Sequence, residues 1–352
     1  MKILILKPSS LGDVIQALPV LRLLKQHFPT AEIFWWIDSA FAPLLENDPD
    51  LAGIVRFERR RWGQPQNWPE MLHSIRWLRA QKFDLVIDLQ CLFRSGAFAW
   101  LSRGKFLIGL DEAREGARGF YDVAIPRKTF HTHAVDWYLS VLPPLGVPVH
   151  ENFQWLPAQP QVAAAIKSKW PTGGSRWITL QPGARWDNKR WPVEKFSELV
   201  SLLARRFPDT RFAILGSKED KLLGEIISSA EPARCLDLCG ATSLPEMIEW
   251  IRLGDLMITN DTGPMHAAAA LGQPVVALFG PTEPRRTGPY GQLHNVLRLE
   301  LPCSPCLKPT CHFEKLNECL VGLSPAMVFE RVNPYFPNKL HKLMLLTYNK
   351  AA

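Results

Sequence analysis

Long apolar runs are absent from this chain of 352 residues, although 47% of its residues are hydrophobic. A transmembrane helix needs about 20 consecutive apolar residues, and no run of that length occurs. The opening residues, MKILILKPSS, also lack the apolar region and the cleavage site of a secretory signal peptide. These absences predict a globular protein of the cytoplasm.

The glycine motif G-x-G-x-x-G of dinucleotide-binding enzymes is also missing, which argues against a dehydrogenase. No nucleic-acid-binding motif is present, so we expect no nucleic-acid partner. The one D-x-D sequence, Asp48-Pro49-Asp50, lies in a polar loop before an expected strand. That position favours a turn over a metal site.

Positive charge is concentrated in one part of the chain. The net charge is +7, and residues 56–128 contain 14 Lys/Arg and 8 Asp/Glu. An excess of +6 in about a fifth of the chain favours an anionic partner such as a lipid headgroup or an acidic glycan.

The length of the chain exceeds that of a single core, so two domains are expected. Residues 143–175 are rich in Pro, Gln and Gly and surround one short expected helix at 161–170, which is typical of a linker. We therefore predict domains at residues 1–160 and 172–323, followed by a helical tail at 324–352.

Apolar runs and amphipathic stretches alternate in both predicted domains, as in parallel α/β sheets. Expected strands are 2–7, 32–37, 53–57, 84–88, 106–109, 177–180, 211–215, 236–239, 256–259 and 275–279. Expected helices are 13–27, 68–81, 134–142, 191–204, 244–253 and 265–271. Ligands of such sheets bind at the carboxyl ends of the strands.

The stretch after the strand 256–259 has the chemistry of a phosphate site. Thr262 and Gly263 precede a short Ala-rich helix, whose first N–H groups attract anions. His266, one turn later, can add a proton or a hydrogen bond. Asp261 would repel a bare phosphate, but its carboxylate can accept hydrogen bonds from a polyol. A phosphate beside a polyol suggests a nucleotide-sugar.

Three motifs of this region, Asp261-Thr262-Gly263-x-x-His266, Phe279-Gly280-Pro281-Thr282 and Arg286-Thr287-Gly288-Pro289, resemble the heptosyltransferase family of lipopolysaccharide core synthesis. The resemblance implies an α/β GT-B fold, in which two Rossmann-like domains face each other across a cleft and the final helix crosses back to the first domain. It implies inverting transfer of heptose from ADP-L-glycero-D-manno-heptose to the anionic inner core of lipopolysaccharide, without metal or other cofactor. It also implies peripheral contact with the inner face of the inner membrane.

The resemblance assigns roles to particular residues. Asp13, in Ser9-Ser10-Leu11-Gly12-Asp13, matches the family's catalytic base; its alternative role is that of a carboxylate at a helix N-terminus. Donor-binding residues would be Lys189 for the diphosphate, with Arg190 as the fallback, together with Asp261, Thr262, Gly263 and His266. Glu219 would hold the ribose hydroxyls, although spacing does not separate it from Asp220.

Acceptor binding would fall to basic residues of the first domain. Arg59, Arg60 and Arg61 match a cationic loop of the family, and Arg114 and Arg118 match a second one. The alternative for the arginine run is an ordinary solvated face.

Two questions stay open at the level of sequence. Cys303, Cys306, Cys311 and Cys319 could bind zinc or remain free thiols, since their spacing is not the repeated C-x2-C pair of a zinc ribbon. The chain could also use another nucleotide-sugar or acceptor, or be a binding module without catalysis. A base at Asp13 and a cation at Lys189 argue against a binding module without catalysis, because binding alone needs no base.

Overall fold

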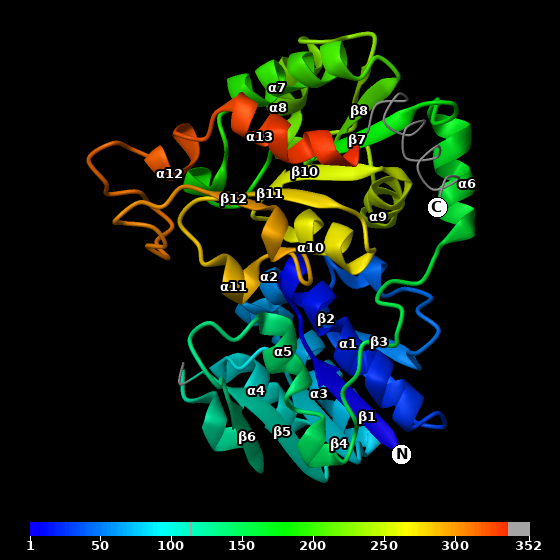
Figure 1. Ribbon diagram of the computed structural model, residues 1–352. Helices are drawn as coiled ribbons and strands as arrows, with labels where there is room; N and C mark the ends of the chain where they lie inside the picture. The colour runs from blue at the N-terminus through cyan, green and yellow to red at the C-terminus, as the bar shows by residue number, and fades with distance from the viewer. Residues whose placement is uncertain (113–114, 337–352) are drawn as a thin grey trace, which may run out of the picture. The chain divides into compact units, whose positions relative to one another are not determined.

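A computed structural model describes residues 1–112 and 115–336. The chain forms two compact units (Figure 1). Unit 1 comprises Met1–Ala158 with Arg285–Thr287, and unit 2 runs from Gln159 to Pro284 and from Gly288 onward. Each unit is built on one six-stranded parallel sheet.

Unit 1 alternates strands and helices along the chain. Its elements are β1 (Lys2–Leu6), α1 (Leu11–His27), β2 (Glu32–Asp38), β3 (Gly53–Phe57), α2 (Arg59–Trp62), α3 (Trp68–Gln81), β4 (Leu85–Asp88), α4 (Phe93–Leu101), β5 (Phe106–Asp111), β6 (Val123–Pro126) and α5 (Ala134–Leu139). The strand order is β3-β2-β1-β4-β5-β6, with Leu4 of β1 paired to Phe34 on one side and Val86 on the other.

Unit 2 repeats this plan. Its elements are α6 (Pro160–Lys169), β7 (Arg176–Gln181), α7 (Val193–Arg206), β8 (Thr210–Ile214), α8 (Lys221–Ser228), β9 (Cys235–Asp237), α9 (Leu244–Leu253), β10 (Leu256–Asn260), α10 (Gly263–Ala270), β11 (Val275–Phe279), β12 (Val296–Arg298), α12 (Glu318–Val321) and α13 (Pro325–Val332). The short helix α11 (Pro284–Thr287) lies between β11 and β12 in the chain.

Both sheets have the strand order of a Rossmann fold. In unit 2 the order is β12-β11-β10-β7-β8-β9, which matches that of unit 1 when β7 is counted as its first strand. The direction of chain crossover reverses between β1 and β4 and between β7 and β10. The loops that leave the carboxyl ends of these two strand pairs are therefore where ligands are expected.

Most predicted elements are confirmed. The predicted ranges of α3, α9, β3 and β11 agree with the structure to the residue. The helix predicted at 134–142 ends at Leu139, because Pro143 and Pro144 have no N–H to continue its hydrogen bonds. The short elements α2, α4, α8, β6 and β12 were not predicted, since three to nine residues carry little periodic signal.

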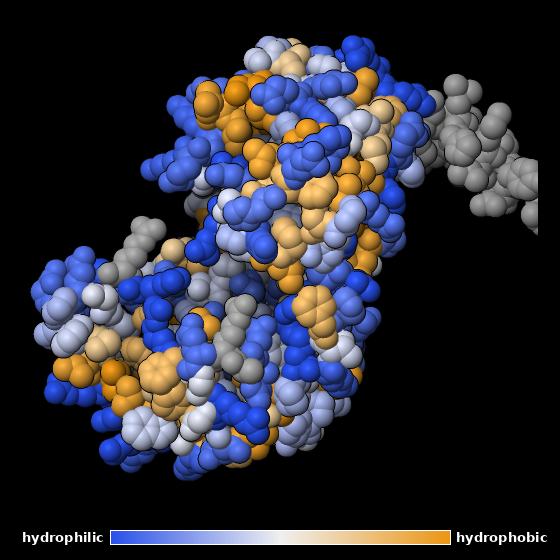
Figure 2. All heavy atoms as spheres, turned by 90° about the vertical axis from the view of Figure 1, so that its left-hand side faces the viewer, coloured by the Kyte–Doolittle hydropathy of each residue, from blue (hydrophilic) through white to orange (hydrophobic). Residues whose placement is uncertain are grey.

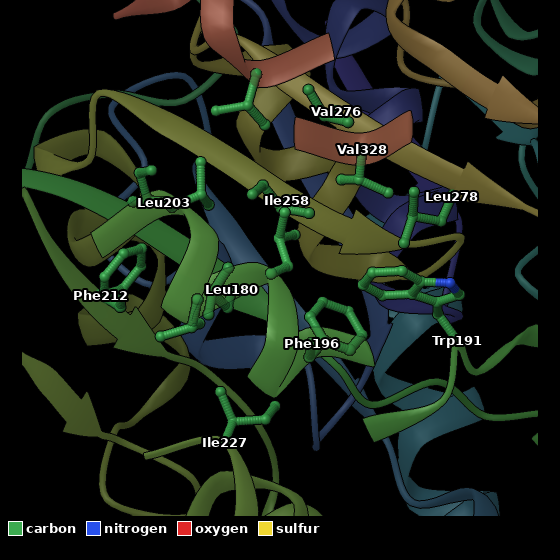
Figure 3. Packing of buried hydrophobic residues seen from close by; sticks show 14 of the residues in the cluster. Leu180, Trp191, Phe196, Leu203, Phe212, Ile227, Ile258, Val276, Leu278 and Val328 are labelled. Carbon is green, nitrogen blue, oxygen red and sulfur yellow. The ribbon is translucent and has the colours of Figure 1, made fainter. Parts of the chain in front are cut away.

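The core of unit 2 shows why α7 forms where it does. Phe196, Leu199, Val200 and Leu203 follow the i, i+3, i+4, i+7 spacing of one helix face, and all are fully buried. Figure 3 shows this face packed against side chains of the sheet, among them Leu180, Ile258, Val276 and Leu278.

The described part of the C-terminal tail belongs to this same core. Helix α13 packs on α7 and β11, and its Val328 and Val332 are fully buried. The tail predicted at residues 324–352 was expected to pack back on the first domain. Its described part packs in unit 2 instead, and residues 337–352 lie outside the described residues.

The D-x-D loop is confirmed as a turn, and it also binds a buried arginine. The Asp50 N–H donates to Asp48 Oδ1 at 3.1 Å. Arg22 of α1 pairs with Asp48 Oδ2 at 2.5 Å and with Asp50 Oδ2 at 2.7 Å. Both carboxylates are thereby used to fix α1 against this loop.

Candidate active site

A cavity of about 440 Å³ lies at the carboxyl edge of the unit 2 sheet. Its lining comes from the end of β7, from the segments after β7, β8, β9 and β10, and from the first turns of α9 and α10: Gln181, Gly183, Ala184, Arg185, Arg190, Gly216, Ser217, Glu219, Asp220, Thr242, Ser243, Leu244, Met247, Thr262 and Pro264. Because parallel strands end at the same edge, four loops that are distant in sequence converge on one hollow.

The N-terminus of α10 opens at this cavity. Thr262 is the N-cap residue, with extended backbone, and Gly263 is the first helical residue. Pro264 therefore lies in the first turn of α10, as its position in the sequence predicted. His266 lies one turn along α10 and is buried.

Asp261 has specific partners. Its Oδ2 accepts hydrogen bonds from Lys189 Nζ at 2.6 Å and from Thr282 Oγ1 at 2.5 Å, and the residue is 6% exposed. Lys189 therefore neutralises the carboxylate next to the predicted phosphate site. This contact explains how an aspartate can stand beside an anion-binding helix end.

The two basic residues proposed for the diphosphate differ in placement. Lys189 lies beside Asp261, with its Nζ 4.7 Å from the centre of the Trp186 ring. Arg190 lines the cavity itself, and its Nε donates to the Ala184 carbonyl at 2.8 Å. Both cations thus lie at the carboxyl edge of the unit 2 sheet, held by different partners.

The structure distinguishes Glu219 from Asp220. Asp220 is buried, and its Oδ2 accepts from Ser217 N at 2.9 Å and Ser217 Oγ at 2.8 Å. A Cβ on Gly183 would lie 2.4 Å from Asp220 Oδ1, so this loop passes Asp220 with no room for a side chain. Glu219 is exposed at the cavity, and hydrogen bonds from its own backbone and from Ser217 lower the pKa of its carboxyl. Glu219 is therefore a charged acceptor available to a ligand.

Several cavity residues were not predicted from sequence. Gln181 is 5% exposed, and its Oε1 has no hydrogen-bond partner among the residues that the structure describes. Ser243 caps α9, and Ser243 N donates to Glu246 Oε2 at 2.7 Å. The capping-box sequence Ser243-x-x-Glu246 could have placed this helix start at the sheet edge. No local signal marks Gln181.

In unit 1, Asp13 lies in the first turn of α1, beside the loop that leaves β1. Its Oδ2 accepts from Ser10 N at 2.9 Å and from Ser10 Oγ at 2.7 Å. Tyr138 Oη donates to its Oδ1 at 3.3 Å. Asp13 is thus a capping carboxylate, as one reading of the sequence expected, and it is also oriented by a residue of α5.

Tyr138 was not predicted, because nothing local connects α5 to the first loop. The residue is 4% exposed, and burial raises the pKa of its hydroxyl well above the ordinary value. The hydroxyl therefore remains protonated and acts as a donor. Lys7, also buried, lies 4.6 Å from the Tyr138 ring centre and donates to the Leu89 carbonyl at 2.9 Å, across β1 and β4.

The arginine run forms the short helix α2 directly after β3, at the same carboxyl edge as Asp13. Trp62 is buried against Phe57 and Phe98, with ring centres 5.4 and 5.9 Å apart, and so anchors this helix. Arg59 and Arg61 are exposed, and Arg61 pairs with Glu70 at 2.5 Å. The side chain of Arg60 lies outside what the structure describes.

The second basic segment is described in part. Arg118 is 75% exposed and pairs with Asp111, at the end of β5, at 3.0 Å. Arg114 lies outside the described residues.

The cysteines carry no disulfide. All seven are free thiols, and burial raises the pKa of Cys319 to about 11. Within residues 1–112 and 115–336, no group of three or more His, Cys, Asp or Glu is arranged to hold a metal ion. Over the same ranges, no helix has the length and apolar character needed to cross a membrane.

Known proteins resemble this chain in sequence and in structure. A sequence profile of glycosyltransferase family 9 (heptosyltransferase) matches residues 71–317. Lipopolysaccharide heptosyltransferase 1 of Pseudomonas aeruginosa is 32% identical over 352 aligned residues, covering 95% of each chain.

Two solved Escherichia coli structures are similar over nearly the whole chain. ADP-heptose LPS heptosyltransferase II has a TM-score of 0.78 at 25% identity and covers 95% of this chain and 98% of its own. Heptosyltransferase WaaC with ADP-2-deoxy-2-fluoro heptose has a TM-score of 0.75 at 25% identity and covers 94% and 99%. These similarities and the two parallel sheets confirm the predicted α/β class of GT-B type.

Proposed function

The chain belongs to glycosyltransferase family 9 (heptosyltransferase), and from this premise we propose that it transfers heptose from ADP-heptose to the inner core of lipopolysaccharide. The observation that carries the proposal is the cavity of unit 2, which Glu219 and the α10 N-terminus line at the edge of the sheet where Lys189 pairs with Asp261.

Each part of the donor has a counterpart among these residues. The diphosphate would bind the N–H groups that follow Thr262, with Lys189 or Arg190 adding positive charge. Glu219 would accept hydrogen bonds from the ribose hydroxyls. Gln181 Oε1 offers a buried acceptor that a bound hydroxyl or amino group would satisfy.

The chemistry is a single displacement. Asp13 takes the proton of an acceptor hydroxyl, and the oxygen forms a bond to the anomeric carbon of heptose while the bond from that carbon to the diphosphate oxygen breaks. The anomeric configuration inverts, and the electron pair leaves with ADP. Hydrogen bonds from Ser10 and Tyr138 orient the Asp13 carboxylate before the transfer.

Negative charge grows on the departing diphosphate and needs stabilisation. The α10 N-terminus and Lys189 can supply it without a divalent ion, because they are fixed in place before the reaction. We therefore propose a metal-independent transfer. The acceptor, an anionic glycan, would bind Arg59, Arg60, Arg61, Arg114 and Arg118 of unit 1.

Mass spectrometry of the products tests the function. The purified protein is incubated with ADP-heptose and truncated lipopolysaccharide, and a mass increase of one heptose residue supports the proposal. A panel of other nucleotide-sugars is run in parallel, and transfer from one of these alone would replace the proposed donor. Binding of ADP-heptose without any transfer would indicate a binding module.

A further inference from the structure

The segment between β12 and α12 has no part in the function proposed above. It comprises residues 299–317, which we name the cysteine loop because Cys303, Cys306 and Cys311 lie in it, half-buried. Figure 2 is viewed from the side on which α12 lies in Figure 1 and shows hydrophobic groups among hydrophilic ones on this face of the molecule. Since the described residues contain neither a disulfide nor a metal-binding group, the loop depends on hydrogen bonds to hold its place.

The cysteine loop is hydrogen-bonded to the motif Phe279-Gly280-Pro281-Thr282 at the end of β11. Ser304 Oγ donates to the Gly280 carbonyl at 2.7 Å. The Leu307 N–H donates to the Pro281 carbonyl at 2.8 Å. The loop thereby fixes the two peptide groups that precede Thr282, the residue whose hydroxyl donates to Asp261.

An arginine of β12 connects the same loop to the residue after Thr282. Arg298 Nη2 donates to the Ser304 carbonyl at 2.6 Å, and Arg298 Nη1 lies 3.7 Å from Glu283 Oε2. Glu283 is 2% exposed, so salt screens this ion pair much less than a surface pair. Thr282 is thus held from both sides along the chain.

A further contact of the loop reaches the residue before Lys189. Asn188 is 4% exposed, and its Nδ2 donates to the Lys308 carbonyl at 2.8 Å. A Cβ on Gly280 would lie 3.3 Å from the Asn188 carbonyl oxygen, so the segments after β7 and β11 are in close contact here. Asn188 Oδ1 has no hydrogen-bond partner among the described residues. A buried acceptor without a partner costs stability, so stability alone does not explain an asparagine at this position.

We propose that Asn188 and Ser304 are positioning residues of the donor site, which act by docking the cysteine loop. Asp261 Oδ2 accepts from both Lys189 and Thr282, and the loop holds the chain next to each of these donors. The Lys189 ammonium is therefore fixed beside the α10 N-terminus before a diphosphate arrives. Binding then costs less, because a long side chain does not have to be ordered at that moment.

The inference deepens the proposed function and rests on it, since it needs a nucleoside diphosphate at the α10 N-terminus. Calorimetry of ADP binding to the full chain tests it. Asn188→Ala should weaken ADP binding about two- to tenfold, the effect of losing one ordinary hydrogen bond. Its fold should persist, because Lys308 is exposed and water can replace the lost donor.

Ser304 supplies a second, independent variant pair. Ser304→Ala removes the donor to Gly280 and should weaken ADP binding in the same range. Ser304→Thr keeps a hydroxyl and should restore most of the wild-type affinity. This pair tests the role of the loop without changing any residue next to Lys189.

A double-mutant cycle separates positioning from a general loosening of unit 2. If Asn188 acts through Lys189, then adding Asn188→Ala to Lys189→Ala should change the affinity for ADP no further. A general loosening of the unit would instead add its full cost in that background.

Two controls remove equivalent hydrogen bonds of unit 2 outside the cavity lining. Gln273→Ala removes an amide that donates to the Arg252 carbonyl at 2.9 Å. Ser229→Ala removes a hydroxyl that donates to the Ile226 carbonyl at 2.7 Å. Both variants should bind ADP as the wild type does, and circular dichroism with melting temperature verifies that every variant is folded.

Weaker ADP binding by Asn188→Ala and Ser304→Ala, with no further loss in the Lys189→Ala background, supports the positioning role. Wild-type affinity in both alanine variants, or additive losses in the cycle, overturns it. A wild type that shows the expected cycle but transfers no heptose overturns the proposed function and supports the positioning role. A wild type that binds no ADP overturns both.

Discussion

The hydroxyl of Tyr138 donates a hydrogen bond to Oδ1 of Asp13 across 3.3 Å, joining α5 to the first turn of α1 although the two residues are 125 positions apart. The bond gives the proposed base a partner that stays protonated, because burial raises the Tyr138 pKa well above its ordinary value. A donor of this kind favours the charged form of the carboxylate.

Tyr138→Phe should therefore move the acid limb of the pH–rate profile to higher pH. Without the donor, the carboxylate binds a proton more easily, and the base is lost at a pH where the wild type still works. At 3.3 Å the bond is long, so the shift should be small. Tyr121→Phe is the matched control, since Tyr121 donates to a different carboxylate, Asp88 Oδ2, at 2.7 Å. If the acid limb lies at the same pH in the wild type and in Tyr138→Phe, then the Tyr138 hydroxyl has no effect on the proposed base and the residue serves only in packing.

Asp13→Asn should lower kcat by at least about 10²-fold, the lower end of what a positioned general base contributes. The affinity for ADP should stay nearly constant, because the donor cavity is lined by unit 2 alone. The amide oxygen can still accept from Ser10, so the loss in melting temperature should be small. A stable variant with wild-type turnover would leave Asp13 as a helix cap only.

Lys189→Ala should weaken ADP binding by roughly 1.5–3 kcal/mol, the range for hydrogen bonds to charged groups. The loss has two parts, since the variant removes a cation and also leaves the nearly buried Asp261 with Thr282 but without its ion-pair partner. Adding Asp261→Asn should then restore part of the affinity, because the neutral amide no longer repels the diphosphate. Calorimetry on the four proteins of this cycle measures the coupling.

Arg190→Ala is the comparison for that cycle, because Arg190 lines the cavity directly. If Lys189→Ala binds ADP as the wild type does and Arg190→Ala does not, then the diphosphate role belongs to Arg190.

Replacing Arg59, Arg60 and Arg61 together by serine should raise the acceptor KM and leave the donor KM nearly unchanged. The same acceptor affinity should decline in the wild type as salt rises, because exposed charges are screened. Arg56→Ser is a suitable control, since Arg56 is an exposed, ion-paired arginine of the same unit, 2.5 Å from Glu46. If the triple variant keeps the wild-type acceptor KM, then Arg59, Arg60 and Arg61 form only a solvated surface and do not bind the acceptor.

Heptose transfer should continue after treatment with EDTA, since Lys189 and the α10 N-terminus are expected to stabilise the leaving diphosphate. Initial rates before and after chelation measure this. Turnover that disappears with EDTA and returns with Mg²⁺ would require a metal in the mechanism.

The sequence alone allowed the elements and their local chemistry to be predicted. Strands such as Val275–Phe279 are short apolar runs bounded by turn residues, and α3 and α9 begin and end at local signals. Thr262 and Gly263 could be placed at a helix N-terminus because a strand, a turn and a helix follow each other within a few residues. Such features depend on neighbours in the chain, so hydrophobic periodicity and turn chemistry are enough to find them.

The partners of the site residues required the tertiary structure. Lys189 and Asp261 are 72 positions apart, and they meet because β7 and β10 pair in the sheet and end at the same edge. Tyr138 reaches Asp13 because α5 packs on α1, and Gln181 faces the cavity only once the loops after β8 and β9 close around it. The order of strands in a sheet is decided by which faces can be buried together over the whole unit. A contact that depends on this order therefore leaves no pattern in the residues on either side of it.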